Sequence, residues 1–295
     1  MILLLGRRGQ IGWELQRSLA PLGQVVAMDR SMCDLADTEA IRRAVRENRP
    51  TIIVNAAAFT DVDGAEVDTE AAIAINTSAP RVLAEEADRL GAVLVHYSTD
   101  YVFNGAAGQP YRETDDPDPI NTYGQTKLDG ERGIQDVGGQ FFILRTSWVY
   151  SLRKPCFVNR IRQWISEKDE IRVVDDQFGS PTWCRLAAEA TALMLAHILG
   201  KRDSVSSVPG GVFHLAGSGG TSRFDLAQEV MTLTSETGSA AKEPPRLSRA
   251  VTAEFPTAAS RPPDTRLDVH LFETTFGLAL PDWRSSLALA LEDHD

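Results

Sequence analysis

The stretch ILLLGRRGQIG, residues 2–12, opens the chain and decides its fold. Its first residues form an unbroken apolar run, as in a strand that is buried on both faces of a sheet. Glycines then recur at three-residue spacing, and residues 13–22 carry leucines at helical spacing. A strand, a glycine turn and a helix in this order predict a dinucleotide-binding unit.

Each part of this glycine turn has a physical purpose. Glycines permit the tight turn and let the backbone approach a pyrophosphate, and the following helix offers free N–H groups and a partial positive charge. The spacing is Gly-x-x-Gly-x-x-Gly rather than Gly-x-Gly-x-x-Gly. We therefore expect the cofactor to contact the turn and the start of the helix, which are Gly6, Gly9, Gln10, Ile11 and Gly12.

A second expected strand, residues 25–28, ends in Asp29 and Arg30. An acidic residue at this distance from the turn binds the ribose 2′-hydroxyl of NAD, whereas an arginine nearby accommodates the 2′-phosphate of NADP. Asp29 therefore indicates NADH, while Arg30, with Arg7 and Arg8 in the turn, indicates NADPH, and the sequence leaves both open. The residues expected at the adenine edge are Asp34 and Leu35.

Two further expected strands, residues 51–54 and 92–97, also end in residues suited to a ligand site. Ligands of open parallel sheets bind at the carboxyl ends of the strands. The first is followed by small residues against which a flat cofactor can lie, namely Ala56, Ala57 and Ala58. The second is followed by segment 98–103, in which Thr99 can donate a hydrogen bond to a substrate oxygen.

Tyr123 and Lys127 stand four residues apart, and residues at this spacing lie on one face of a helix. An ammonium beside a phenol favours the phenolate, so the sequence predicts a tyrosine whose pKa lies below the usual value of about 10. Such a pair suits proton transfer to or from an oxygen near neutral pH. Asn121 or Thr122 can cap this helix, and the polar segment 104–121 is expected to cover the site.

The alternation of strands and helices loosens after residue 150. The remaining expected elements are helices at 37–48, 157–166, 186–199, 283–291 and from about 222, strands at 141–144, 171–174 and 212–215, a polar loop at 201–211 and extended chain at 243–263. Residues 65–90 are mostly helical, and the segment 76–80 is expected to end one helix before another starts after Pro80.

This pattern predicts an α/β fold with a doubly wound, parallel Rossmann-type sheet. We expect a dinucleotide-binding domain at residues 1–150. Residues 151–295 are expected to form a smaller α/β substrate-binding part that is interleaved with the first.

Composition and charge exclude several classes of protein. The chain has 295 residues and carries 30 Lys and Arg against 41 Asp and Glu, a net charge of −11. Such a surface repels nucleic acid and anionic membranes, and no apolar run approaches the ~18 residues of a membrane span. Cys33, Cys156 and Cys184 are far apart and follow no metal spacing, so we expect reduced thiols and a cytoplasmic protein.

Several motifs together resemble the extended short-chain dehydrogenase/reductase superfamily and, within it, the dTDP-4-dehydrorhamnose reductases. They run almost from end to end, and they are the glycine turn, residues 54–58, 98–103, 145–150, 176–182 and 280–283, and the Tyr-x-x-x-Lys pair. The resemblance implies reduction of the 4-keto group of dTDP-4-dehydro-L-rhamnose to dTDP-L-rhamnose by NADPH or NADH. That reaction serves the synthesis of cell-surface polysaccharide such as the O-antigen of lipopolysaccharide.

The resemblance also implies roles for single residues. Tyr123 donates the proton, Lys127 lowers the pKa of that tyrosine and holds the nicotinamide ribose, and Thr99 polarises the carbonyl. Asn76 joins the cofactor contacts already named. The residues implied in substrate binding are Thr99, Asp100, Phe103, Trp148, Gln177, Phe178 and Arg261, of which the last three hold the nucleotide diphosphate.

One part of the family pattern is missing. Some family members hold Mg²⁺ at a dimer contact between two glutamates. Glu14 matches the first of them, but Arg185 stands in the second position, and one cation cannot ligate another. We therefore predict no metal site, with Glu14 as the one candidate ligand, and the sequence leaves a homodimer open.

Other functions in the same superfamily can be weighed on the same residues. A nucleotide-sugar 4,6-dehydratase carries Asp-Glu after the active-site threonine, whereas Tyr101 follows Asp100 here, which disfavours dehydration. A 4-epimerase or another nucleotide-sugar reductase stays open. A non-catalytic regulatory subunit would have a degraded catalytic set, and the intact Thr99, Tyr123 and Lys127 argue against it.

Overall fold

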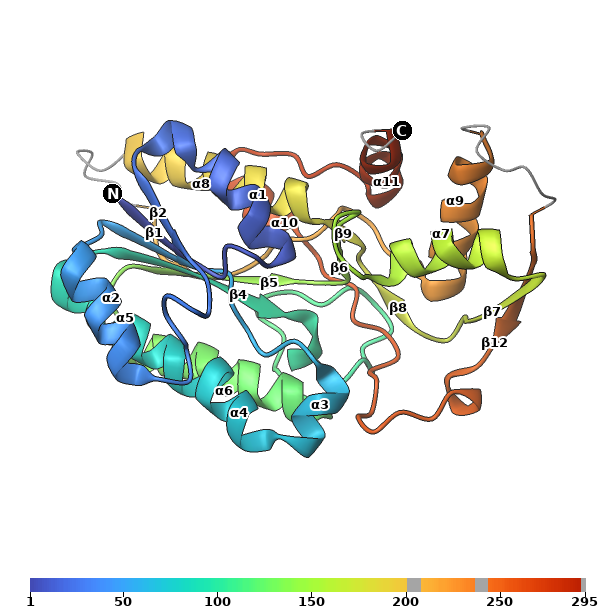
Figure 1. Ribbon diagram of the computed structural model, residues 1–295, viewed down its shortest axis with the longest axis horizontal. Coiled ribbons are helices and arrows are strands. Elements are labelled where there is room, and N and C mark those ends of the chain that lie inside the picture. The colour runs from blue at the N-terminus through green and yellow to red at the C-terminus, as the bar shows by residue number, and fades with distance from the viewer. Residues whose placement is uncertain (201–207, 237–243, 293–295) are drawn as a thin grey trace.

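The computed structural model describes residues 1–200, 208–236 and 244–292, and its centre is a parallel β-sheet with helices on both faces (Figure 1). The sheet has six strands in the order β10-β5-β4-β3-β1-β2. Their bounds are β1 (Ile2–Leu5), β2 (Val25–Met28), β3 (Ile52–Asn55), β4 (Val93–Thr99), β5 (Phe141–Thr146) and β10 (Gly211–His214). Because the order reverses at β1 and β3, this is a doubly wound sheet, and the predicted fold class is confirmed.

Each face of the sheet has its own layer of helices. The first layer consists of α1 (Gln10–Ser18), α8 (Cys184–Gly200) and α10 (His270–Phe276), and the second of α2 (Thr38–Asn48), α5 (Ala79–Leu90) and α6 (Thr122–Val137) (Figure 1). Ile2 and Leu4 pack with the first layer, whereas Leu3 and Leu5 pack with the second. This burial on both faces is the reason that β1 is apolar at every position.

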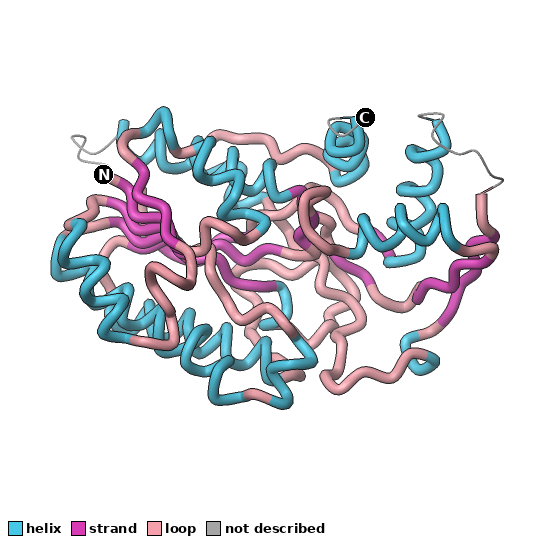
Figure 2. The backbone as a smooth tube through the Cα atoms, in the orientation of Figure 1, coloured by secondary structure: helices cyan, strands magenta, loops and turns pink. Residues whose placement is uncertain are grey.

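The chain after residue 150 builds a smaller core and also returns to the main sheet. The helices α7 (Phe157–Glu167), α9 (Arg223–Glu236) and α11 (Trp283–Glu292) enclose the smaller core. Short strands pair around it, and these are β7 (Glu170–Val174) with β12 (Arg246–Ala250), β6 (Val149–Tyr150) with β9 (Thr182–Trp183), and β8 (Phe178–Gly179) with β11 (Thr221–Ser222) (Figure 2). Since α8, β10 and α10 belong to the main unit, the chain passes between the two cores more than once.

The interruption expected at residues 76–80 is wrong, because the helical path continues there. α3 (Val62–Val67) and α4 (Thr69–Ile73) lead into a π-helical turn, η2 (Ala74–Ser78), and α5 follows directly. Pro80 lies in the first turn of α5, where a missing backbone N–H leaves no helical hydrogen bond unmade. The wider π turn therefore carries the chain past the proline without a break.

Some of the smaller elements differ from the sequence expectation. α10 has too few residues for a clear hydrophobic period, so the sequence does not reveal it. The segment expected to be extended at 243–263 contains β12 and a short turn, η4 (Thr252–Glu254). Two other 3₁₀ turns are η1 (Ala20–Leu22) and η3 (Asp100–Val102). The sequence predicts a polar loop at residues 201–211, and its residues 201–207 lie outside the described part of the chain.

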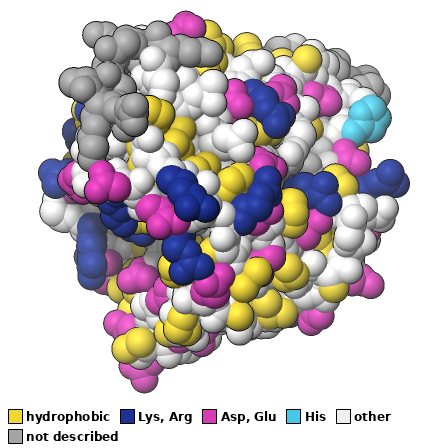
Figure 3. Space-filling view, turned by 90° about the vertical axis from the view of Figure 1, so that its right-hand side faces the viewer, with side chains coloured by type: hydrophobic (Ala, Val, Ile, Leu, Met, Phe, Trp, Pro, Cys, Tyr) yellow, Lys and Arg dark blue, Asp and Glu magenta, His cyan; other side chains and the backbone are white. Residues whose placement is uncertain are grey.

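The outer end of the smaller unit carries charges of both signs. Figure 3 faces this end, and Lys and Arg side chains lie across its middle among acidic ones. Arg249 forms an ion pair with Asp175, and Arg172 pairs with Glu254. Paired in this way, these two arginines add little positive potential that could attract nucleic acid.

Two further expectations concern the chemistry of the whole chain. None of the described helices is both long and apolar enough to cross a membrane. The three cysteines are free thiols, and Cys33 and Cys184 are buried, which raises the pKa of each to about 11.

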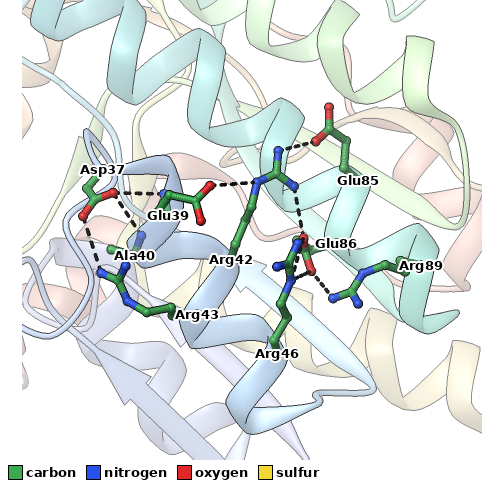
Figure 4. A network of polar contacts seen from close by, with 9 residues as sticks. All are labelled: Asp37, Glu39, Ala40, Arg42, Arg43, Arg46, Glu85, Glu86 and Arg89. Atoms are coloured by element: carbon green, nitrogen blue, oxygen red, sulfur yellow. Dashed lines mark hydrogen bonds and ion pairs between the residues drawn. The ribbon is translucent and has the colours of Figure 1, made fainter.

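A buried carboxylate joins α2 to α5 beneath the sheet (Figure 4). Glu86 is 1% exposed, and its carboxylate receives hydrogen bonds from Arg42 at 3.1 Å, from Arg46 at 2.6 Å and from Arg89. Burial raises the pKa of Glu86, but the three guanidinium groups outweigh it and bring the pKa down to about 2.

We predict that Glu86→Gln lowers the free energy of unfolding at pH 7 by about 2 kcal/mol, because it leaves partly buried guanidinium groups without their acceptor. The pKa of Glu86 is lower in the folded state than in the unfolded state. Its contribution to the free energy of unfolding is therefore complete above about pH 4.5 and disappears as the pH falls toward 2. Denaturant titrations of both proteins at several pH values measure this.

Glu85→Gln is the matched control. Glu85 is the neighbouring residue, and its carboxylate is more exposed and binds Arg42 at 2.8 Å. An exposed ion pair contributes well under about 1 kcal/mol. Equal losses in the two variants would contradict the assigned importance of the buried carboxylate.

Candidate active site

A cleft of about 1340 Å³ lies at the carboxyl ends of the central strands. It is the place where a doubly wound sheet binds its ligand. Many of the residues predicted from the sequence line it, and these are Gly6, Gly9, Gln10, Ile11, Asp29, Arg30, Asp34, Leu35, Ala56, Ala57, Ala58, Thr99, Asp100, Tyr123, Lys127 and Trp148. The fold thus brings residues from five strand ends to one cavity.

The glycine turn is packed so tightly that two of its positions accept no side chain. Gly6 has a positive φ of 86°, and a Cβ there would lie 2.7 Å from the Ala57 nitrogen. A Cβ on Gly12 would lie 2.1 Å from the Gly6 carbonyl oxygen. Gly12 therefore lies beneath the turn rather than at the cleft wall, and its part is to let α1 approach β1.

The start of α1 fits an anionic ligand. Gly9 is the N-cap, and no side chain caps the free N–H groups of the first turn. The buried side-chain oxygen of Gln10 also has no hydrogen-bond partner in the described part of the chain. A pyrophosphate would accept hydrogen bonds from the N–H groups, and a donor elsewhere on a dinucleotide would satisfy this oxygen.

The end of β2 holds the carboxylate expected to select the cofactor. Asp29 accepts hydrogen bonds from the Ser31 hydroxyl at 2.5 Å and the Ser31 N–H at 3.1 Å, and it pairs with Arg8 at 2.8 Å. The Ser31 hydroxyl is the main cause of the lowered pKa of Asp29, and Arg8 adds to it. Arg30 bonds Asp34 at 3.1 Å, so both arginines lie at the rim with much of their surface exposed.

Lys127 lies deep in the cleft and is 1% exposed. Its amino group donates to the Tyr97 carbonyl at 2.6 Å and lies 3.2 Å from His96 Nε2. Burial lowers the pKa of Lys127 to about 8. The ammonium is thus held at the end of β4, and at neutral pH most of it keeps its proton.

A polar chain continues from Lys127 to the next strand. The Nδ1 atom of His96 lies 3.1 Å from the Asn55 amide nitrogen, and Asn55 Oδ1 accepts the Ala57 N–H at 3.1 Å. Since this orientation aims the Asn55 NH₂ at Nδ1, a neutral imidazole carries its proton on Nε2, toward Lys127. The proton on His96 Nε2 faces the Lys127 amino group and, like burial, disfavours its charged form.

The sequence predicts that the pKa of Tyr123 lies below its usual value, and this prediction is wrong for the protein by itself. Burial raises the pKa of this phenol, and the Thr99 hydroxyl only partly offsets it. Because the Lys127 amino group is directed at Tyr97 and His96, its charge does not overcome the cost of burying a phenolate. Tyr123 is therefore a protonated phenol at neutral pH, which is the form that a proton donor needs.

Asp100 ties Thr99 to both halves of the chain. The Thr99 hydroxyl donates to Asp100 at 3.1 Å, and Ser147 and Thr265 donate to the other carboxylate oxygen at 2.7 and 2.5 Å. Burial raises the pKa of Asp100, and these hydroxyls lower it in part. The carboxylate fixes the strand end that carries Thr99.

A comparison with known families identifies the kind of protein that has this cleft. The family model described as the RmlD substrate binding domain matches residues 1–295. The chain belongs to the RmlD family.

Individual members of the RmlD family are similar over their whole length. The dTDP-4-dehydrorhamnose reductase of Burkholderia thailandensis is 41% identical, covering 99% of this chain and 98% of the relative. The enzyme of that name from Escherichia coli K12 is 40% identical, covering 99% and 97%. A crystal structure of dTDP-4-dehydrorhamnose reductase from Bacillus anthracis in complex with NADP has a TM-score of 0.87 and 30% identity, covering 99% and 98%. The resemblance drawn from the motifs is confirmed.

Two residues predicted to touch the ligands lie elsewhere in this RmlD-family chain. Asn76 is fully buried and bonds the backbone of Phe59 through both its oxygen and its nitrogen, at 2.9 and 3.0 Å. It therefore holds a cleft-lining residue rather than lining the cleft. Phe103 is also fully buried and stacks on Tyr111 at 4.1 Å in the core.

The three residues predicted to hold the diphosphate are also outside the cleft lining. Gln177 donates to the Thr252 hydroxyl at 3.0 Å, and Phe178 lies beside Arg266. Arg261 bonds Asp63 at 2.6 Å and the Ala259 carbonyl at 3.2 Å. These contacts engage the side-chain nitrogen of Gln177 and both terminal nitrogens of Arg261 with neighbouring protein atoms.

Sequence reasoning missed several residues that line the cleft in this RmlD-family protein. They include Ser31, Tyr101, Thr146, Lys154 and Arg223. The ring of Tyr101 meets that of Tyr123 edge to face at 5.9 Å. For Tyr101 a signal existed, because it follows the predicted Asp100 at a strand end. Arg223 has no such local signal, because it comes from the other half of the chain.

The residues around Glu14 do not fit a divalent cation. The Glu14 carboxylate pairs with Arg185 at 3.6 Å, and Arg17 and Arg153 line the same small cavity. Within the described residues, no group of three His, Cys, Asp or Glu side chains could hold a metal ion. The guanidinium of Arg185 takes the place that a second carboxylate would need.

We predict that Lys127 makes the stability of this protein rise with alkaline pH. Its folded pKa of about 8 lies below the usual 10.5, so between these values the unfolded chain binds the extra proton. Relative to Lys127→Met, the free energy of unfolding of the native sequence should increase by about 2 kcal/mol from pH 8 to pH 10. Denaturant titrations of the two proteins measure the difference, and a flat difference would contradict the depressed pKa.

Proposed function

We propose that this protein reduces the 4-keto group of dTDP-4-dehydro-L-rhamnose to dTDP-L-rhamnose with NADPH, and that NADH can replace it. The reaction belongs to the synthesis of dTDP-rhamnose for cell-surface polysaccharide. The observation that carries the proposal is a single cleft that joins a dinucleotide turn to Thr99, Tyr123 and Lys127. The full-length similarity to dTDP-4-dehydrorhamnose reductases supports the choice of substrate.

The cleft has places suited to each part of a dinucleotide. The glycine turn and the start of α1 suit the pyrophosphate, and Asp29 with Arg8 suits the adenosine ribose. Ala56, Ala57 and Ala58 leave room beside the backbone. When bound, the reduced nicotinamide supplies the hydride that the ketone carbon accepts.

Tyr123 supplies the proton that the ketone oxygen accepts. Its raised pKa keeps the phenol protonated until negative charge develops on that oxygen. The Thr99 hydroxyl can donate to the same oxygen, as electrostatic stabilisation of the developing charge. The carbonyl thus gains a hydride at carbon and a proton at oxygen, which gives the alcohol.

Lys127 balances the charge that Tyr123 acquires. The ammonium has three donors, and the Tyr97 carbonyl takes one of them at 2.6 Å. The remaining donors can bind the nicotinamide ribose and favour the phenolate once the proton has left. The same charge lowers the free energy of the phenolate, so the proton leaves Tyr123 more readily than it would leave an isolated buried phenol.

The direct test mixes the purified protein with dTDP-4-dehydro-L-rhamnose and follows the absorbance of NADPH and of NADH in separate reactions. We expect oxidation of the cofactor to depend on the sugar nucleotide, and dTDP-L-rhamnose to accumulate in equal amount. Absence of turnover with both cofactors would contradict the proposal and favour an epimerase or a non-catalytic subunit.

Tyr123→Phe should lower kcat by at least about 100-fold, because it removes the proton donor, and leave NADPH affinity nearly unchanged. Steady-state kinetics and a cofactor binding titration measure the two effects. Tyr111→Phe is the matched control, since Tyr111 is a buried tyrosine outside the cleft lining whose hydroxyl bonds Asn104. Full activity in Tyr123→Phe would remove the acid role from this residue.

We propose that NADPH is preferred because the carboxylate of Asp29 is already engaged by Ser31 and Arg8. Arg8→Ala should raise the KM for NADPH by about tenfold and change the KM for NADH little, because it removes a charged donor for the 2′-phosphate. Arg17→Ala, which removes the same charge from α1 outside this cleft, is the control. Equal increases for both cofactors would contradict a 2′-phosphate contact.

We propose that the two parts of the chain bind different ligands. Residues 1–150 hold the cofactor, and residues 151–295 supply most of the substrate-binding part. A homodimer without a bridging Mg²⁺ and a cytoplasmic location complete the proposal, and light scattering with metal analysis tests the dimer.

A further inference from the structure

Arg223 is a half-buried cation in the wall of the cleft. It is the first residue of α9, and its guanidinium carbon lies 3.6 Å from the centre of the Trp148 ring and 5.0 Å from that of Phe157. Within the described part of the chain, no carboxylate forms an ion pair with it. Burial lowers the pKa of Arg223, although an arginine stays protonated in proteins.

The surroundings of Arg223 are rigid. Its backbone N–H donates to the Gln177 carbonyl at 3.1 Å, and β11, which precedes it, pairs with β8. The Ser222 hydroxyl donates to Asp175 at 2.7 Å and accepts the Asp225 N–H at 3.0 Å. The guanidinium is therefore presented from a fixed helix start rather than from a loose loop.

Trp148 is equally constrained. Its φ is 43°, a left-handed conformation that is rare for a bulky side chain and is typical of functional sites. A Cβ on Gly179 would lie 2.3 Å from its indole ring, so only a glycine lets the ring pack there. Trp148 thus has a strained backbone conformation at the position where its indole lies beside Arg223.

The Asp100 carboxylate acts on Arg223 without forming an ion pair with it, and the hydroxyls of Ser147 and Thr265 already bond that carboxylate. A cation in a cleft wall that no carboxylate pairs with is suited to an anionic ligand. Tyr101 lies between Arg223 and the proton donor, since its hydroxyl is a hydrogen-bond partner of Arg223 and its ring meets that of Tyr123 edge to face. The anion that Arg223 is suited to bind therefore belongs to the molecule whose ketone faces Tyr123. In a nucleotide sugar the diphosphate carries the negative charge.

We infer that Arg223 binds the diphosphate of the nucleotide-sugar substrate, with the Trp148 indole holding the guanidinium plane in place. A guanidinium offers paired donors that match two phosphate oxygens. Arg261 is less suited to this purpose, because it already pairs with the Asp63 carboxylate and donates a second hydrogen bond to the Ala259 carbonyl. The inference rests on the proposed function, and it names the residue that gives the substrate its charge-dependent affinity.

The test measures binding and not turnover, so that it can fail separately from the proposed reaction. Calorimetry compares dTDP with thymidine, and UDP with uridine, on the protein saturated with NADP⁺. We expect the native protein to bind each diphosphate far more tightly than its nucleoside. Arg223→Gln should weaken binding of the diphosphates by about 30-fold and leave the nucleosides and NADP⁺ unchanged. Arg223→Lys keeps the charge but loses the paired donors of the guanidinium. Its affinity for the diphosphates should lie between that of the native protein and that of Arg223→Gln.

Arg284→Gln is the matched control, because Arg284 also lies over a tryptophan, 4.3 Å from the Trp283 ring, but outside the cleft. Equal weakening for diphosphate and nucleoside in Arg223→Gln would mean that the residue only supports Trp148, and the inference would fall. It would fall as well if Arg261→Gln lost the diphosphate preference while Arg223→Gln kept it, or if the native protein bound no nucleoside diphosphate. Absence of turnover with a normal binding contrast would instead contradict the proposed reaction alone.

Discussion

The hydrogen bond from the buried Lys127 amino group to the Tyr97 carbonyl is the contact on which the rest of the site depends. It attaches α6, which carries Tyr123, to the end of β4. Through His96 and Asn55 the same polar chain reaches the end of β3, where the backbone faces the expected cofactor. One buried cation thus sets the distance between the proton donor and the dinucleotide platform, and burial keeps this chain free of competing water.

A second buried charge connects the sheet to the smaller unit. Asp100 receives the hydroxyls of Thr99, Ser147 and Thr265, which come from β4, from the segment after β5 and from the C-terminal part of the chain. The position of Thr99 therefore depends on residues far away in sequence. Arg223 enters the same cleft from the smaller unit, opposite in sign to Asp100 and without an ion pair of its own among the described residues.

Much of the fold was predictable because its signals are local. The apolar run of β1, the glycine turn and the leucine spacing of α1 follow one another within a short stretch, and the strand ends at Asp29, Ala56 and Thr99 repeat the pattern. The path around Pro80 was not predictable, because a π turn leaves no periodic signal of its own. The division at residue 150 stays a prediction, although the later segments β10 and α10 belong to the main unit.

The sequence by itself determined the order of the elements, the glycine turn and the helical spacing of Tyr123 and Lys127, because these depend on neighbours along the chain. Tertiary structure decided what each group can do. Burial makes Tyr123 a weaker acid than its spacing from Lys127 indicates, and Arg261 forms an ion pair with Asp63. The pairing of β8 with β11 brings Arg223 to the cleft. Burial and ion pairing arise from contacts between distant segments, so these properties exist only once the chain has folded.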